Sequence, residues 1–206
     1  MIDNMNDKNI INRFDIAYKN INEQEMSHIK KYLYNYLYIY NEDFEDDLNK
    51  LPLNIKILGF YSKNCKLHNL PKHIKWLNLF DLQNHYVIPS HIDILYVGHK
   101  YLYKFPHVLA TISYGIKVLI LEIMTEDITE INLNYLPDSI EKIILTFDYC
   151  SIKLNLNKVC NNLHCIYINE PNNINNIEEI EEYIKKNNID LIENYMSYEA
   201  IFEEYI

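Results

Sequence analysis

The stretch that decides the fold reads Leu136-Pro137-Asp138-Ser139-Ile140-Glu141-Lys142-Ile143-Ile144-Leu145. Its second half is a six-residue unit with apolar residues at the first, fourth and sixth positions, and the last two share one side of a strand. The proline ahead of this unit favours an extended backbone and removes one N–H donor. The stretch therefore predicts a short β-strand with one side available for burial.

The same spacing recurs six times in phase along the chain. The six copies begin at Ile55, Ile74, Ile92, Ile116, Ile140 and Leu163. Successive copies start 19, 18, 24, 24 and 23 residues apart. An apolar-proline pair precedes four of them, namely Leu51-Pro52, Leu70-Pro71, Ile88-Pro89 and Leu136-Pro137. Because no single coil can bury its apolar side alone, the repeat predicts coils that stack into a parallel sheet.

This pattern resembles a leucine-rich repeat, and the form Leu-Pro-x-x-Ile-x-x-Leu-x-Leu in Leu136–Leu145 is similar to the FNIP-type variant of amoebae and giant viruses. The resemblance covers roughly residues 51–168. It implies an α/β fold: a leucine-rich-repeat-like solenoid with a curved parallel β-sheet, short irregular or helical return segments, and helical terminal caps.

Coil length predicts what connects one strand to the next. Coils of 18–19 residues leave room for extended or single-turn return segments, whereas coils of 23–24 residues can hold a helix. Phe105–Gly115 is the candidate helix, with Pro106 at a first helical position and Gly115 just past the end.

The flanks divide the chain into three parts. Residues 1–50 are expected to form an N-terminal cap with a degenerate first repeat, residues 51–169 the leucine-rich-like repeats, and residues 170–206 an acidic helical C-terminal cap. Glu23–Lys31 is predicted as a helix because Asn22 and Glu25 stand at capping-box spacing. Residues 32–40 alternate tyrosine with other residues, which indicates a strand.

The C-terminal part carries a helical pattern followed by a strand pattern. Ile177, Ile180 and Ile184 predict an amphipathic helix of about ten residues. A last strand is expected at residues 189–192, and Ser197–Ile206 is expected to be a terminal helix that covers the open end of the stack.

Residues between and after the apolar anchors are expected on the opposite, concave side of the sheet. This side is apolar and aromatic, which is typical of partner sites. The candidate protein-binding residues are Tyr36, Tyr38, Tyr61, Trp76, Phe80, Tyr96 and Tyr167. Two alternatives stay open: the face is sealed by the flanking segments, or it reflects only the β-propensity of an Ile/Tyr-rich chain.

Composition narrows the classes of function. The 206 residues are 49% hydrophobic and 23% charged, as in a globular chain. The net charge of −10 and the lone arginine, Arg13, argue against nucleic-acid binding. The longest uncharged runs, Tyr32–Asn41 and Phe105–Ile116, are too short to cross a bilayer, so no membrane partner is expected. Residues 1–7 lack a basic-then-apolar leader, and reduced cysteines are expected.

Catalytic motifs are not apparent in the sequence. Gly59, Gly98 and Gly115 are the three glycines, too few for a phosphate-cradling loop or a nucleophile elbow. The Ser90-His91-Asp93 run brings triad residue types together by coincidence, since strand neighbours point to opposite faces.

Two groups of cysteine and histidine residues contain side chains of the types that bind metal ions. Cys160, His164 and Cys165 lie close together but lack paired zinc-ligand spacing, and buried thiols are the simpler interpretation. His73 and His91 occupy the same place in adjacent coils, and two solvated edge histidines are the simpler interpretation there. We therefore expect no catalytic residues, no metal and no cofactor.

The favoured function is a non-enzymatic protein-binding repeat module that uses the aromatic concave face. The alternatives are a self-associating structural or assembly component of a viral particle or factory, and a substrate-recognition adaptor of a ubiquitin-type ligase. The expected partner is another protein or a second copy of the chain. The expected compartment is the cytoplasm, that of the host if the protein is viral.

Overall fold

The structure is a computed structural model of the chain. The residues it describes are 13–16, 21–32, 34–40, 47–61, 67–80, 87–104, 107–124, 126–148, 151–158 and 160–193. The predicted terminal helix Ser197–Ile206 lies outside these ranges, as do Phe105, Pro106, Cys65 and Cys150.

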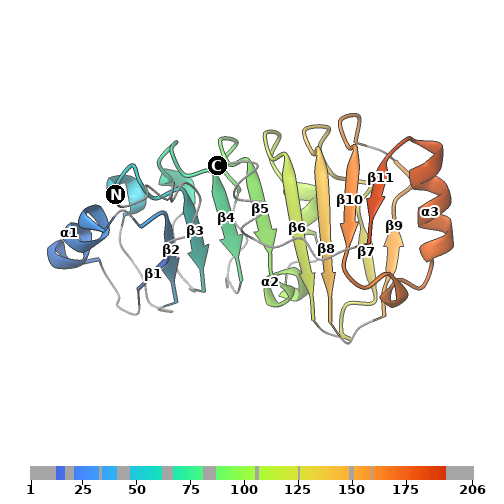
Figure 1. The fold of residues 1–206 in the computed structure, drawn as a ribbon, viewed down its shortest axis with the longest axis horizontal. Coiled ribbons are helices and arrows are strands. Elements are labelled where there is room, and N and C mark those ends of the chain that lie inside the picture. The colour runs from blue at the N-terminus through green and yellow to red at the C-terminus, as the bar shows by residue number, and fades with distance from the viewer. Residues whose placement is uncertain are drawn as a thin grey trace, which may run out of the picture.

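The fold is α/β, with nine parallel strands in one large sheet. The strand order is β1-β2-β3-β4-β5-β6-β8-β10-β11, while β7 and β9 form a separate pair. The bounds in the large sheet are β1 Arg13–Ile16, β2 Tyr36–Ile39, β3 Ile57–Phe60, β4 Trp76–Leu79, β5 Ile94–Val97, β6 Val118–Ile123, β8 Lys142–Phe147, β10 Cys165–Ile168 and β11 Asp190–Ile192. Figure 1 shows these strands side by side in chain order.

The six strands expected from the repeat are confirmed, and they pair in the register that the repeat implies. Leu58 lies opposite Leu77, which lies opposite Leu95, and the same row continues to Leu119 and Ile143. Since every repeat places its strand at the same point of its coil, each apolar anchor stacks on its equivalent. The degenerate first strand, β2, and the expected last strand, β11, are confirmed as well.

Each apolar-proline pair sets up a turn into the strand. The carbonyl of Pro52 accepts a hydrogen bond from the backbone N–H of Ile55 at 3.1 Å. Pro71, Pro89 and Pro137 make the equivalent bonds, at 3.0, 3.2 and 3.1 Å. Each proline therefore supplies the first residue of a four-residue turn that delivers the chain into the sheet.

One face of the sheet lies on the main core. Leu58, Leu77, Leu95 and Leu119 from the strands are fully buried there. The return segments complete the core with single-turn 3₁₀ helices at Leu48–Lys50, Leu67–Asn69 and Val108–Thr111, and with the two-stranded sheet of β7 (Glu130–Asn132) and β9 (Lys153–Asn155). A long row of leucine and isoleucine thus separates the sheet from its return segments.

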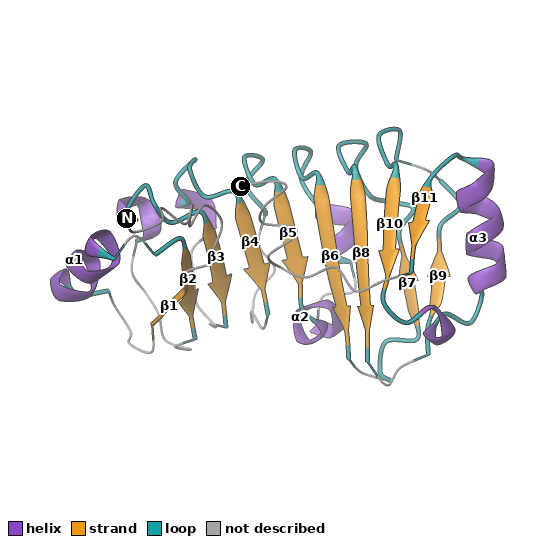
Figure 2. Cartoon of the chain, viewed as in Figure 1, coloured by secondary structure: helices purple, strands orange, loops and turns teal. Residues whose placement is uncertain are grey.

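Helices stand at both ends of the large sheet (Figure 2). The first, α1 (Glu23–Lys31), has the predicted capping box: the Asn22 side chain accepts from the Glu25 N–H at 2.8 Å, and the Glu25 carboxylate accepts from the Asn22 N–H at 2.9 Å. The predicted helix at the other end is α3 (Ile177–Lys186), which buries Ile180 and Ile184. No helix in the described part of the chain has the length and apolarity to span a membrane.

The helix predicted at Phe105–Gly115 is wrong for its described part. A short helix, α2 (His99–Lys104), precedes that range, and Val108–Thr111 forms a single 3₁₀ turn. From Ile112 the chain runs without a helix into a turn at Gly115, whose φ is +130°. Val108 and Leu109 pack onto the core in this single turn, and that tertiary packing outweighs the helix start and stop signals that Pro106 and Gly115 provide in the sequence.

Candidate protein-binding face

Alternate side chains of the large sheet point away from the main core and form a second apolar cluster. Its buried members are Ile57, Trp76, Ile94, Tyr96, Val118, Ile120 and Ile144, with Tyr36, Phe80 and Tyr167 packed against them. We call the side of the sheet that carries these residues the aromatic face. The sequence placed all of them on this side, and the cluster confirms that placement.

The centre of the aromatic face is not exposed to water. Trp76 is 0% exposed and Tyr96 is 1% exposed, so the expectation that these two are accessible anchors is wrong. The other five candidates, Tyr36, Tyr38, Tyr61, Phe80 and Tyr167, are half-buried. The sequence did carry a signal for the burial of Trp76 and Tyr96. Runs such as Ile94-Leu95-Tyr96-Val97 lack the alternating polar residues of a sheet with one solvent-exposed face.

A chain of hydrogen bonds ties the buried aromatic residues together. The indole N–H of Trp76 donates to Asn78 Oδ1 at 2.6 Å, and Asn78 Nδ2 donates to the Tyr36 hydroxyl at 3.0 Å. Asn78 is 2% exposed, so its amide depends on these partners. Burial raises the pKa of Tyr36 to about 12, although the Asn78 hydrogen bond opposes that rise. The phenol therefore stays neutral at physiological pH.

Gly59 makes room for the tyrosines of the preceding strand. It lies between Tyr38 and Asn78 in the register of β2, β3 and β4. A Cβ atom at this position would lie 2.7 Å from Tyr38 Cδ2 and 2.8 Å from the Tyr36 hydroxyl. The missing side chain thus lets both rings lean over β3.

Three half-buried rings and one exposed ring lie at or near the ends of β2, β3 and β4. We call these residues the aromatic rim: Tyr38, Tyr61 and Phe80, which are half-buried, and Tyr40, which is exposed. The ring centroids of Tyr38 and Phe80 are 5.4 Å apart at 88°, and those of Tyr38 and Tyr40 are 6.1 Å apart at 25°. Tyr40 is 45% exposed. These spacings are those of interacting aromatic pairs, so the rings hold one another in place while staying partly accessible.

Two cations pack on the rim, and sequence reasoning missed both. The Arg13 guanidinium lies 4.3 Å from the centroid of the Tyr38 ring. Lys100 Nζ lies 5.2 Å from the Tyr61 ring centroid and donates a hydrogen bond to the Tyr61 hydroxyl at 3.1 Å. Neither residue belongs to the repeat, so no periodic signal in the sequence could place them beside these rings.

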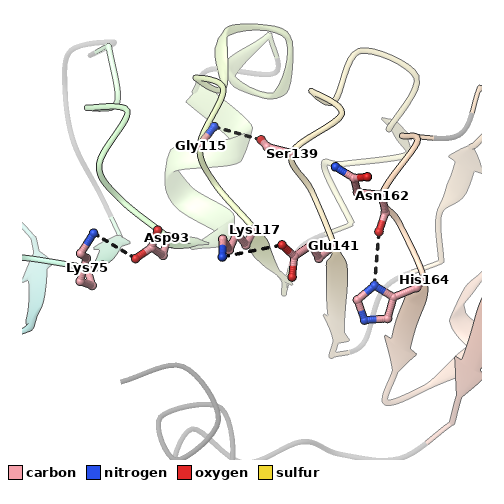
Figure 3. Close-up of polar contacts among 8 residues, drawn as sticks. All are labelled: Lys75, Asp93, Gly115, Lys117, Ser139, Glu141, Asn162 and His164. Atoms are coloured by element: carbon pink, nitrogen blue, oxygen red, sulfur yellow. Dashed lines mark hydrogen bonds and ion pairs between the residues drawn. The ribbon is translucent and has the colours of Figure 1, made fainter.

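A column of polar residues runs along the edge where the strands begin (Figure 3). Lys75 Nζ lies 3.2 Å from Asp93 Oδ2, and Lys117 Nζ lies 3.8 Å from Glu141 Oε1. His164 stands at the equivalent place of the next coil, with Nδ1 3.3 Å from the Asn162 carbonyl oxygen. Residues at one repeat position therefore alternate in charge from Lys75 to Glu141, and each pair is partly exposed and worth about 0–1 kcal/mol.

His73 and His91 lie at equivalent turns and are not the solvated histidines expected from sequence. The Nε2 atoms of both rings are inaccessible and have no hydrogen-bond partner. Each ring instead has a hydrogen bond with the backbone of the preceding turn, at Pro52 for His73 and at Pro71 for His91, which opposes the lowering of its pKa. These histidines therefore join neighbouring turns.

The pKa values of both histidines lie below the usual imidazole range, chiefly because burial disfavours the charged ring. Charged groups around them add to this effect, namely Lys56 near His73 and Lys72 and Lys75 near His91, while Asp93 opposes it at His91. Because folding lowers these pKa values, the unfolded chain binds protons more readily.

We expect unfolding stability to be lost as pH falls below about 6.5, the ordinary histidine pKa, towards the lowered folded values. Stability is fully present above that range. Urea unfolding from pH 7.5 to 5 measures the loss. A His73→Asn/His91→Asn variant, which uses the residue present at the equivalent position 54, should lose less over the same range. An equal loss in the variant would assign the pH dependence to other groups.

The cysteine cluster does not converge on one point. Cys160 is buried in the main core, with Sγ 3.5 Å from the Leu136 carbonyl oxygen, whereas Cys165 lies in the register row of Lys142 on the aromatic face. His164 is exposed. Among the described residues, no group of three His, Cys, Asp or Glu side chains is arranged to hold a metal ion.

Neither the triad-like run of residues nor the hollow found in the structure has the features of an active site. Asp93 of the Ser90-His91-Asp93 run forms an ion pair with Lys75. A hollow of about 240 Å³ lies between α2 and the segment leading into β7, lined by residues such as Leu102, Leu109 and Glu130. That volume is below the roughly 300–1,000 Å³ of typical ligand pockets.

Comparison of the chain with protein-family models, with curated proteins and with solved structures finds no match in any of the three. Function is therefore argued from the residues of the aromatic face and its rim.

Proposed function

We propose that this chain is a leucine-rich-repeat-like solenoid that binds another protein, without catalysis, at the aromatic rim. The in-register rows of the large sheet support the solenoid, because equivalent residues of successive coils lie opposite one another. Short return segments support it too, since successive copies of the pattern start 18 to 24 residues apart.

The aromatic rim is the observation that carries the binding proposal. Tyr38, Tyr61 and Phe80 keep part of their surface accessible, and Tyr40 keeps 45%. Ring contacts and the two cations hold these side chains in place before any partner arrives. Pre-ordered aromatic side chains lose little conformational entropy on binding and are enriched at binding hot spots.

Capture from a lysate of the native cell or infected host, read by mass spectrometry, tests the proposal. A Tyr61→Ala/Phe80→Ala variant should retain at least about tenfold less of the bound protein, because hot-spot truncation costs about 2 kcal/mol or more. Both positions are half-buried, so the fold should tolerate these changes better than changes at Trp76.

The matched control is Tyr114→Ala/Tyr135→Ala, which removes two rings that are 69% and 65% exposed and lie outside the rim. This variant should capture as the unaltered chain does. Equal capture by the rim variant would contradict the proposal. Recovery of the chain alone would instead favour the assembly alternative, in which the chain binds its own copies.

A further inference from the structure

The most exposed large apolar side chains of the described residues lie along one edge of the large sheet. They are Val87 at 76%, Leu53 at 74%, Tyr114 at 69% and Tyr135 at 65% exposed. Each stands two or five residues ahead of the isoleucine that opens a repeat unit, so all four belong to the turns that lead into the strands. Figure 2 shows these turns along the edge where the strands begin, and we call it the turn edge. Apolar side chains gathered at this exposure are typical of an interface.

The charges of the turn edge change sign about its middle. We compare the positions two residues before and one residue after the isoleucine that opens each unit. In coil order, the charged residues at these positions are Lys72 and Lys75 ahead of β4, Asp93 ahead of β5, Lys117 ahead of β6, and Asp138 and Glu141 ahead of β8. The same series read backwards has the opposite charge at every place. The turn edge is therefore complementary to a copy of itself that runs in the opposite direction.

A twofold axis along the sheet normal, between β5 and β6, produces this antiparallel arrangement. Rotation about the axis reverses both the strand direction and the coil order, so the turns of two copies meet end to end. The coil of β4 then lies opposite the coil of β8 in the second copy, and the coil of β5 lies opposite that of β6. Because each contact occurs twice, the assembly closes at two copies.

The ion pairs within each chain fit this arrangement. Lys75 Nζ lies 3.2 Å from Asp93 Oδ2, and Lys117 Nζ lies 3.8 Å from Glu141 Oε1, as drawn in Figure 3. Under the twofold, the first pair of one copy lies opposite the second pair of the other. Every cation then faces an anion across the interface as well as within its own chain. Such complementarity sets the register in which two surfaces bind.

Apolar side chains occupy the middle of the same surface. Val87 belongs to the coil of β5 and Tyr114 to the coil of β6, so both lie beside the twofold axis. The charged residues of the coils of β4 and β8 lie one strand spacing, about 4.8 Å, farther out. An apolar centre with a charged surround is the usual anatomy of a specific interface. The charge match ends outside these four coils, because Lys56 ahead of β3 corresponds to His164 ahead of β10.

We propose that the turn edge binds a second copy of this chain in an antiparallel twofold dimer, with Val87 and Tyr114 at its centre and the coil of β4 opposite the coil of β8. This inference does not rest on the binding role proposed for the aromatic rim. The rim lies where the strands end, so both surfaces can be occupied at once. A Tyr114→Ala/Tyr135→Ala chain should therefore be monomeric and still capture a partner at the rim.

Charge reversal in two separate full-length chains tests the pairing. One chain carries Lys72→Glu/Lys75→Glu and the other carries Asp138→Lys/Glu141→Lys. In sedimentation velocity the unaltered chain should dimerise with rising concentration, and each variant alone should dimerise at least about tenfold more weakly, since like charges then meet twice. An equimolar mixture of the two variants should regain the affinity of the unaltered chain, because both contacts of the mixed dimer join opposite charges.

The matched control is Lys100→Glu/Lys153→Glu, which changes the net charge as much as the first variant but on α2 and β9, away from the turn edge. This chain should dimerise as the unaltered chain does. The proposal is overturned if the unaltered chain stays monomeric up to about 1 mM. A mixture that dimerises no more tightly than its two components overturns it as well.

A second measurement covers a charge-reversed chain that loses the circular dichroism of the sheet. Benzoylphenylalanine replaces Tyr114 in the otherwise unaltered chain, where the exposed position should tolerate it. Photo-crosslinks between copies should map to residues 87–90 of the second copy. Crosslinks between copies that map only to other segments, or none between copies, contradict the proposal.

Discussion

Replacing Trp76 by alanine is expected to lower the free energy of unfolding by about 3–5 kcal/mol. The side chain is fully buried, so its removal leaves a cavity in the aromatic face. It also takes away the N–H that Asn78 Oδ1 accepts at 2.6 Å, leaving a buried amide short of a partner. Urea unfolding measures the loss.

A Trp76→Phe variant separates the two contributions. It keeps most of the ring volume and removes the N–H, so the loss should be about 1–3 kcal/mol. A loss below about 1 kcal/mol for Trp76→Ala would mean that this ring does not belong to a packed interior. The expected loss also makes Trp76→Ala unsuitable for testing partner capture, since weaker capture could reflect unfolding.

Gly115→Ala is the second substitution with a large expected effect, a loss of about 2–4 kcal/mol. The φ of Gly115 is +130°, a region that disfavours any side chain. A Cβ atom there would lie 2.2 Å from the carbonyl oxygen of Ser90 in the preceding coil. The backbone must move, and the hydrogen bond from the Gly115 N–H to Ser139 Oγ, 3.0 Å long and drawn in Figure 3, would move with it.

The opposite change at Asn188 provides the control. Asn188 has a φ of +53° without being glycine, so Asn188→Gly should raise stability by less than about 1 kcal/mol. Both variants are compared by urea unfolding. A stability loss for Gly115→Ala no greater than about 0.5 kcal/mol would show that the turn adapts without strain.

The strands were predictable because each one repeats the same local pattern. Spacing of apolar residues located six strands, and alternation located the seventh, Tyr36–Ile39. The capping box located α1 because Asn22 and Glu25 interact locally, without help from the rest of the fold. Features set by neighbouring residues in sequence were therefore accessible without a structure.

Features that depend on contacts between residues distant in sequence could not be predicted without the structure. The apolar runs of the strands indicate that both faces of the sheet are covered, but the hydrogen bonds from Trp76 to Asn78 and on to Tyr36 link β4 to β2 and have no signal in the sequence. The strands β1, β7 and β9 hold only three or four residues each, and each is defined by pairing with a strand distant in sequence, β1 with β2 and β7 with β9. Val108–Thr111 forms a single 3₁₀ turn because Val108 and Leu109 pack onto the core, although Pro106 and Gly115 in the sequence favour a longer helix.

The alternating column at the strand starts limits how the number of coils can change. Lys75, Asp93, Lys117 and Glu141 occupy one position in four successive coils. Deleting the coil of Asp93 alone would put Lys75 beside Lys117, two like charges at strand spacing. Deleting the coils of Asp93 and Lys117 together would put Lys75 beside Glu141 and keep the alternation. Lys56, at the same position of the preceding coil, already stands beside Lys75, so the column tolerates one like-charge neighbour, and these weak surface pairs would oppose a single-coil deletion only slightly.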